Sequence, residues 1–200
     1  MSEWSKKRSI MRSYDTTAQI YEMRYFEEQT AKIKEALEAT AINKNSLVLD
    51  AGCGTGILFA YIAKKAKTII GLDVSRKILF EAKRRADNFQ NVNLILADAD
   101  NMPLKERLFK NVFAFTLLQN MPSPAKTLSE IKRVANKNAI IVVTGMKKTF
   151  ALNEFERLLR SARLKVVSLK HEGLKCYVAI CIIEFTSCLA QNCHKQIRQT

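Results

Sequence analysis

The chain has 200 residues, of which 48% are hydrophobic, 26% are charged and 8% are aromatic. This length and composition supply one buried core and exclude both a large multidomain enzyme and a wholly disordered chain. Lysine and arginine number 33 against 19 aspartate and glutamate residues, which gives a formal net charge of +14. Such an excess favours a polyanionic partner such as nucleic acid.

The cellular compartment follows from three features of the sequence. The amino-terminal residues MSEWSKKRSIM carry cations with no apolar stretch behind them, so no secretory signal is predicted. The apolar runs VFAFTLL and YVAICII are far shorter than the roughly 20 residues that a membrane span needs. The five cysteines are an odd number and argue against a disulfide framework. We therefore expect a cytoplasmic protein without a membrane span.

Hydrophobic periodicity predicts an alternation of helices and strands along the chain. Residues 16–40 predict a helix with Phe26, Thr30, Ile33 and Leu37 along one face. Ser123 and Pro124 are typical of an N-cap and a first helical position. The other predicted elements are, in chain order, strand 46–50, helix 56–67, strand 68–73, helix 76–89, strand 92–97, strand 111–118, the helix from Pro124, strand 139–145, helix 151–162, strand 164–170 and strand 176–185.

This alternation predicts an α/β fold. Strands separated by helices indicate βαβ units, and continuous apolar strands indicate a sheet that is covered on both faces. The last two strands have no helix between them, so the final strand is expected to run antiparallel. The predicted architecture is a doubly wound, mostly parallel, seven-stranded sheet with helices on both faces. Residues 186–200 predict a polar tail.

A glycine-rich loop, Asp50-Ala-Gly-Cys-Gly-Thr-Gly56, lies where the first predicted strand meets the following helix. Glycines there let the backbone turn sharply and approach a ligand closely, and the amino terminus of the helix favours an anionic group. The spacing is G-x-G-x-G, whereas a dinucleotide-binding fingerprint needs G-x-G-x-x-G. The loop therefore predicts a binding site for a ligand other than a dinucleotide.

Three segments in order resemble the class I S-adenosylmethionine-dependent methyltransferases, in particular a methyltransferase type 11-like domain. The segment LDAGCGTG is similar to the first motif of that family, and LDVS and LADADNMPL are similar to the acidic motifs after its second and third strands. The resemblance is strong from about residue 46 to residue 145. It implies a Rossmann-like fold, a methyltransferase activity and S-adenosylmethionine as cofactor, and it is silent about the substrate.

The resemblance also implies roles for individual residues. The glycine-loop backbone would hold the methionine part of the cofactor, with Asp50 near its ammonium group. Asp73 would accept hydrogen bonds from the ribose hydroxyls, and Asp98 from the adenine amino group. Alternatively, Asp73 and Asp98 act only as N-caps of the helices that follow. The implied cofactor-binding set in this part of the chain is Asp50, Ala51, Gly52, Cys53, Gly54, Gly56, Asp73, Val74, Asp98 and Ala99.

The amino-terminal segment resembles the lid helix that many of these enzymes place over the cofactor. Arg24 would pair with the cofactor carboxylate, and Tyr14 or Tyr21 would close one wall; alternatively, the tyrosines are ordinary half-buried helix residues. Together with the fold prediction, this divides the chain into an amino-terminal lid segment and helix at 1–40, a methyltransferase domain at 41–185 and the tail at 186–200.

The methyl acceptor is less well defined by the sequence. Gln119 and Asn120 follow the fourth predicted strand and are candidates to orient an acceptor, but no catalytic base is identified, and the Asp/Asn-Pro-Pro-aromatic motif of exocyclic-amine methyltransferases is absent. The spacing of Cys176, Cys181 and the later cysteines does not match common zinc sites, so no metal is expected.

Basic residues predict the acceptor class. Lys147 and Lys148 are expected at a cationic rim around the site, together with Lys6, Lys7, Arg8, Arg12 and Lys175. Such a rim favours RNA, either transfer or ribosomal RNA, as acceptor. The alternatives are a small molecule such as a quinone precursor, or a module that binds the cofactor without catalysis. A small activator subunit is a further expected partner.

Overall fold

The computed structural model describes the backbone of residues 3–184, and their side chains except those of residues 6 and 13–24. The predicted tail at 186–200 lies outside the described residues. Within residues 3–184, no helix combines the length and the apolar character that crossing a membrane requires.

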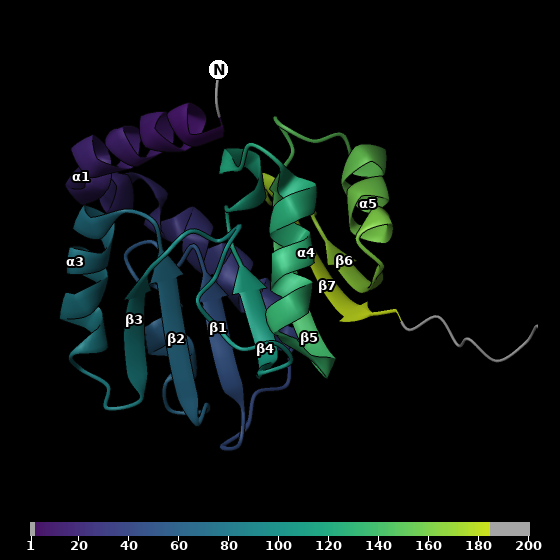
Figure 1. Ribbon diagram of the computed structural model, residues 1–200, viewed down its shortest axis with the longest axis horizontal. Coiled ribbons are helices and arrows are strands. Elements are labelled where there is room, and N and C mark those ends of the chain that lie inside the picture. Colours follow the sequence, from purple (N-terminus) through teal and green to yellow (C-terminus); the bar gives the residue numbers. More distant parts are fainter. Residues whose placement is uncertain (1–2, 185–200) are drawn as a thin grey trace, which may run out of the picture.

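The strands form one seven-stranded sheet in the order β3-β2-β1-β4-β5-β7-β6 (Figure 1). The strands are β1 (Leu47–Ala51), β2 (Thr68–Asp73), β3 (Val92–Leu96), β4 (Phe109–Ala114), β5 (Ala135–Met146), β6 (Leu164–Lys170) and β7 (Cys176–Ile183). The helices are α1 (Glu3–Glu38), α2 (Phe59–Ile62), α3 (Arg76–Ala86), α4 (Pro124–Val134) and α5 (Leu152–Ser161), with a 3-10 helix η1 (Leu118–Asn120).

Strand direction confirms the predicted topology. Strands β1 to β5 pair in parallel, and β7 runs antiparallel to both β5 and β6. The chain builds outward from β1 through β2 to β3 and then returns to place β4 on the other side of β1. In open α/β sheets, a crevice at the carboxyl ends of the strands next to such a reversal is the usual ligand site.

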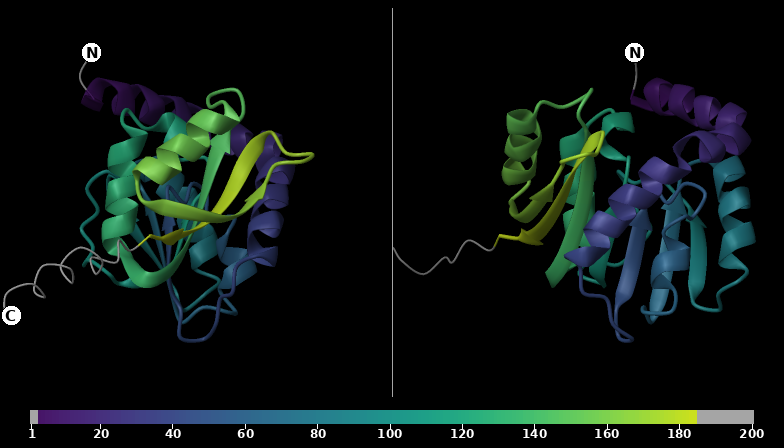
Figure 2. Two further views of the ribbon diagram at one scale, coloured as in Figure 1. Left: turned by 90° about the vertical axis from the view of Figure 1, so that its right-hand side faces the viewer. Right: turned by 180° about the vertical axis from the view of Figure 1, so that it is seen from behind.

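Helices cover both faces of the sheet, as predicted. One core lies between the sheet and α1, α2 and α3, and it includes Ile33, Phe59 and Leu79. The other lies between the sheet and α4 and α5, and it includes Ile131 and Phe155. The views from the side and from behind show these two layers (Figure 2). The first part of α1 departs from them and lies across the ends to which the arrows of β1, β2 and β3 point (Figure 1).

The amino-terminal helix is longer than predicted, and its buried face includes Ile33 of the predicted face but not Phe26. It begins at Glu3 rather than at residue 16. Phe26, predicted on the buried face, is 44% exposed, whereas Lys32 is fully buried. The apolar pattern misses Lys32 because this side chain is buried through polar contacts, as described below.

Two elements around the site are shorter than predicted because the chain leaves regular structure there. The helix predicted at 56–67 is α-helical only over Phe59–Ile62, and the side chain of Asn91 donates to the carbonyl oxygens of Ala63 and Ala66 at its end. The strand predicted at 111–118 ends at Ala114, because Thr116 takes a left-handed φ of 55° and η1 follows.

Candidate functional site

A cavity lies at the carboxyl ends of β1, β2 and β4, beneath the first part of α1, with a volume of about 140 Å³. It contains most of the predicted cofactor residues, which come from three segments far apart in sequence. Those lining it are Asp50, Gly52, Cys53, Gly54, Asp73, Val74, Asp98 and Ala99. Ala51 and Gly56 stand behind this lining, and the side chains of Tyr14, Tyr21 and Arg24 lie outside the described residues.

The glycine loop is shaped by backbone conformations that other residues avoid. Gly52, Gly54 and Gly56 all have positive φ, at 73°, 54° and 79°. A Cβ atom at Gly56 would lie 2.4 Å from the ring of Phe59, so this position also needs glycine for space. The N–H groups of Gly52 and Cys53 donate to the carbonyl of Leu72, which ties the loop to the end of β2.

Asp50 is a buried acid at the base of the cavity. Only 2% of the surface of Asp50 is exposed to solvent. Burial raises the pKa of the Asp50 carboxyl to about 8, and the charge of Asp73 adds to the shift. The same environment raises the pKa of the Cys53 thiol well above its usual value, mainly through burial, so Cys53 is a neutral wall of the site rather than a nucleophile. A cationic ligand group beside Asp50 would favour its ionised form.

Backbone N–H groups of the glycine loop and of the segment before α3 hold the Asp73 carboxylate. Its Oδ2 accepts from the N–H of Gly54 at 3.1 Å, and its Oδ1 accepts from the N–H of Ser75 at 2.9 Å. The N-cap of α3 is Ser75, whose hydroxyl accepts from the N–H of Ile78. The alternative that Asp73 caps this helix is therefore wrong, and its carboxylate is directed at the glycine loop.

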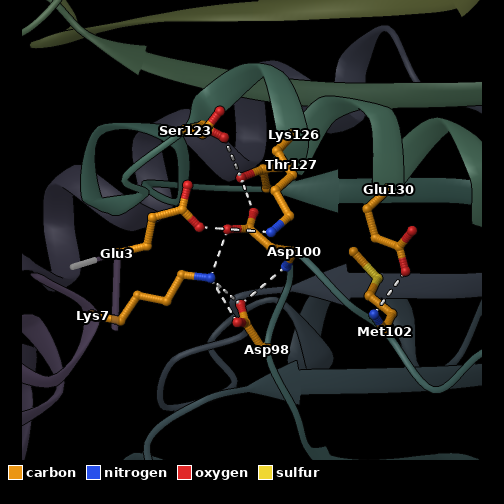
Figure 3. A network of polar contacts seen from close by, with 9 residues as sticks. All are labelled: Glu3, Lys7, Asp98, Asp100, Met102, Ser123, Lys126, Thr127 and Glu130. Atoms are coloured by element: carbon orange, nitrogen blue, oxygen red, sulfur yellow. Dashed lines mark hydrogen bonds and ion pairs between the residues drawn. The ribbon is translucent and has the colours of Figure 1, made fainter. Parts of the chain in front are cut away.

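Asp98 belongs to a network of charged groups with Lys7 at its centre (Figure 3). The Lys7 ammonium lies 2.8 and 2.6 Å from the two oxygens of Asp98 and 2.6 Å from Oδ2 of Asp100. Asp98 Oδ1 also accepts from the N–H of Asp100, and Thr127 donates to the other oxygen of Asp100. No helix begins at Asp98, so the N-cap alternative is wrong here too.

Lys7 corrects one sequence prediction. It was expected on an exposed cationic rim, but it is 7% exposed and lines the cavity. Burial alone would lower the pKa of its ammonium, but the hydrogen bonds to Asp100 and Asp98 outweigh that effect and raise it. Lys7 therefore neutralises acids inside the protein and is withdrawn from any contact with an external polyanion.

The opposite wall of the cavity is formed by the segment after β4 and by α1. Asn120 lines the cavity as predicted and donates to the carbonyl of Thr116 at 2.9 Å. Gln119 lies outside the lining, and its buried Oε1 has no hydrogen-bond partner among the described residues. Sequence reasoning missed Gln29 and Thr116, which also line this wall, and Lys32 behind them. Ala36, one turn after Lys32 on the same helical face, is the small apolar residue that could have placed Lys32 inward.

Lys147 and Lys148 are exposed, in the turn that follows β5 at the same edge of the sheet, and do not line the cavity. The ammonium of Lys147 donates to the carbonyl of His171 at 2.7 Å. Its backbone N–H donates to the carbonyl of Lys175, which places the exposed Lys175 beside it. Arg8 and Arg12 are exposed on α1. Of the predicted rim residues, Lys7 is therefore buried, and the side chain of Lys6 lies outside the described residues.

Cysteine placement agrees with the sequence analysis where the structure describes it. Cys176 and Cys181 belong to the cores on opposite faces of the sheet, as their odd spacing predicted. Among the side chains that the structure describes, no group of three or more from His, Cys, Asp and Glu is arranged to hold a metal ion.

Comparisons with known proteins place this geometry in a family. A family model described as a methyltransferase domain matches residues 42–196. The chain is 28% identical over 150 residues to a malonyl-[acyl-carrier protein] O-methyltransferase of a Marinomonas species, and this match covers 74% of this chain and 55% of that protein. It is 37% identical over 82 residues to a probable ribosomal RNA small subunit methyltransferase A of Methanococcus aeolicus, and this match covers 41% of this chain and 30% of that protein. The chain thus spans about half, or less, of these relatives.

A solved structure supports the same fold. The complex between the Haloferax volcanii methyltransferase activator Trm112 and a methyltransferase matches with a TM-score of 0.73 and 14% identity, over 88% of this chain and 98% of the matched chain. Together with the match to the family model over residues 42–196, these findings show that the chain belongs to the S-adenosylmethionine-dependent methyltransferases of class I.

Proposed function

We propose that this chain transfers a methyl group from S-adenosylmethionine to an RNA acceptor. The observation that supports cofactor binding is the meeting of Asp50, Asp73 and Asp98 in one cavity at the carboxyl ends of neighbouring strands. Carboxylates suit a cofactor that carries an ammonium and a sulfonium, and they would repel the pyrophosphate of a dinucleotide. The donor set of this chain therefore fits the family cofactor.

Each acid has a distinct proposed role. Asp50 pairs with the cofactor ammonium, and the ion pair stabilises its ionised form. Asp73 accepts from the ribose hydroxyls. A carboxylate offers about four acceptor positions. Lys7 and the Asp100 N–H take positions on both oxygens of Asp98, which leaves room on Oδ2 for the adenine amino group.

The first part of α1 is proposed to act as a lid. Its residues Lys7, Ile10 and Met11 face the cavity at helical spacing. The cavity volume of about 140 Å³ is below the roughly 300–1,000 Å³ of small-molecule sites. We therefore expect this part of α1 to move outward when a nucleoside-sized ligand enters.

Methyl transfer itself needs few catalytic groups. The cofactor supplies an electrophilic methyl group, and transfer is an in-line displacement in which positioning carries most of the rate enhancement. The protein would contribute by holding the cofactor at the glycine loop and the acceptor against the wall formed by Thr116 and Asn120. No general base is assigned.

The acceptor class rests on charge. Exposed cations at the carboxyl-end edge, namely Arg8, Arg12, Lys147, Lys148 and Lys175, form a rim that suits a phosphate backbone. A small-molecule acceptor is the second candidate, because Phe115, Leu117 and Met121 make one wall of the cavity apolar. The matched Marinomonas protein is a malonyl-[acyl-carrier protein] O-methyltransferase.

A small activator subunit remains a proposed partner, by analogy with the matched Haloferax volcanii complex.

Two measurements test this proposal, one for cofactor binding and one for the methyl acceptor. Calorimetry should detect S-adenosylmethionine binding to the wild type, and Asp73→Ala should lose about 1–3 kcal/mol of binding free energy because ribose hydroxyls are left unpaired. Asp87→Ala removes an exposed acid at the carboxyl-terminal cap of α3 and serves as the control. Labelled methyl donor is then supplied with total RNA, protein, lipid and small-metabolite fractions.

Label in the RNA fraction supports the proposed acceptor, and label only in small metabolites replaces it with the second candidate. Binding without label in any fraction, even when a co-purifying small protein is present, would favour a module that binds the cofactor without catalysis. Equal affinities of wild type and Asp73→Ala would overturn the site.

A further inference from the structure

Thr116, on the wall of the cavity after β4, is held in an unfavourable conformation. Its φ is 55°, which is a genuine outlier for a β-branched residue. Its N–H donates to the hydroxyl of Thr144 at 2.7 Å, and its carbonyl accepts from the side chain of Asn120 at 2.9 Å. The surrounding structure thus imposes the conformation, and such imposed strain clusters at functional sites.

The Thr116 hydroxyl receives hydrogen bonds from α1. The Lys32 ammonium lies 3.0 Å from Oγ1 of Thr116, and Nε2 of Gln29 lies 3.3 Å from it. Lys32 is fully buried and pairs with Glu28 at 3.4 Å. Because a lysine ammonium can only donate, Lys32 takes one of the two acceptor positions of Oγ1, and the Gln29 amide lies beside the hydroxyl.

The Thr116 hydroxyl has only a long contact to which it can donate. Its Oγ1 lies 3.4 Å from Oε1 of Gln29, whereas the oxygen atoms of ordinary O–H···O hydrogen bonds are about 2.5–3.0 Å apart. Thr116 and Gln29 both line the cavity. An entering atom that accepts a hydrogen bond can replace this long contact, and donation from Lys32 polarises the hydroxyl and makes it a stronger donor.

We propose that Thr116 binds the methyl acceptor through its hydroxyl proton and that Lys32 is a positioning residue that acts through Thr116. This inference rests on the proposed function, because it assumes that the acceptor enters the same cavity. It selects acceptors with an oxygen or an unprotonated nitrogen beside the atom that is methylated.

The test compares Thr116→Val, which keeps the shape and removes the hydroxyl, with Thr116→Ser, which keeps the hydroxyl. Lys32→Met removes the donor behind it, and the double variant combines Thr116→Val with Lys32→Met. Lys34→Met, at an exposed position on the same helix, is the matched control. Turnover and KM are measured with whichever fraction the wild type labels, and S-adenosylmethionine affinity is measured by calorimetry.

Thr116→Val should lower kcat/KM at least tenfold, with cofactor affinity changed less than threefold, and Thr116→Ser should restore most of the loss. Lys32→Met should give a similar loss, and the double variant should be no worse than either single variant, because both disrupt one interaction. Wild-type turnover in Thr116→Val, or losses that multiply in the double variant, would overturn the inference. If Lys32→Met fails to fold, the comparison of Thr116→Val with Thr116→Ser still tests the inference. A wild type that labels nothing would instead overturn the proposed function, and this inference with it.

Discussion

Asp50 shows how one residue couples the site to the stability of the protein. Its side chain is buried next to a second carboxylate, so the folded protein binds a proton there with a pKa of about 8. The unfolded chain, in which the carboxyl is exposed to water, binds that proton only below a pKa of about 4. Between these values the folded state holds more protons than the unfolded state, so stability falls as the pH rises.

Replacing Asp50 with asparagine should remove this pH dependence. From pH 5 to pH 8, the free energy of unfolding of the wild type should fall relative to that of Asp50→Asn by up to about 4 kcal/mol, from roughly 1.4 kcal/mol per pH unit. Urea unfolding at the two pH values measures the difference, with Asp87→Asn as an exposed control. Parallel behaviour of wild type and Asp50→Asn would mean that Asp50 is ionised in the folded protein.

Among the elements, α1 links the two ends of the cavity. Near its amino terminus it contributes Lys7 to the acids of the predicted adenine end, and further along it contributes Lys32 to the proposed acceptor end. A second contact, between Glu3 and Lys126, joins α1 to α4 on the surface (Figure 3). The position of one helix therefore affects both halves of the site.

The buried contact should dominate the attachment of α1. Lys7→Met leaves Asp98 and Asp100 without their buried cation, and breaking a buried ion pair from one side costs about 3–5 kcal/mol. Glu3→Gln breaks a pair whose side chains are 57% and 53% exposed, worth at most about 1 kcal/mol. Urea unfolding measures both losses, and hydrogen exchange shows whether the first turns of α1 open. A Lys7→Met variant as stable as Glu3→Gln would contradict this assignment.

For the whole molecule, the net charge of +14 matters through its position rather than its sum. Part of it is neutralised internally, as at Lys7, or is paired on the surface of α3, as at Lys83 and Arg84. The exposed cations Lys147 and Lys148 are the part that we propose meets a long polyanion. Charge at that rim would raise both the rate and the affinity of RNA association.

RNA binding should therefore depend steeply on salt. For single strands, the slope of log affinity against log salt concentration should be near −0.7 for each phosphate contact. Reversing charge at Lys147 and Lys148 should weaken RNA binding and reduce this slope, while cofactor affinity stays nearly unchanged because neither residue lines the cavity. Filter binding over a range of salt concentrations measures this effect. Salt-independent binding, or no effect of the reversals, would favour the small-molecule acceptor.

Local sequence determined the frame of this protein. Apolar strands, the glycine loop and acids at strand ends predicted the sheet, the parallel direction of most of its strands and the position of Asp50, Asp73 and Asp98. These predictions were possible because each signal is carried by residues close together in the chain. The turn at Gly52–Gly56 is an example, since its positive φ values need glycine wherever the loop is placed.

Tertiary structure alone decided the polar contacts that complete the site. Lys7 meets Asp98 across 91 residues, and Lys32 meets Thr116 across 84. Periodicity places a lysine on the solvent side of a helix, because burying an unpaired charge is costly. Only when the fold brings Asp98, Asp100 and Thr116 against α1 do these lysines gain the hydrogen bonds that make their burial favourable.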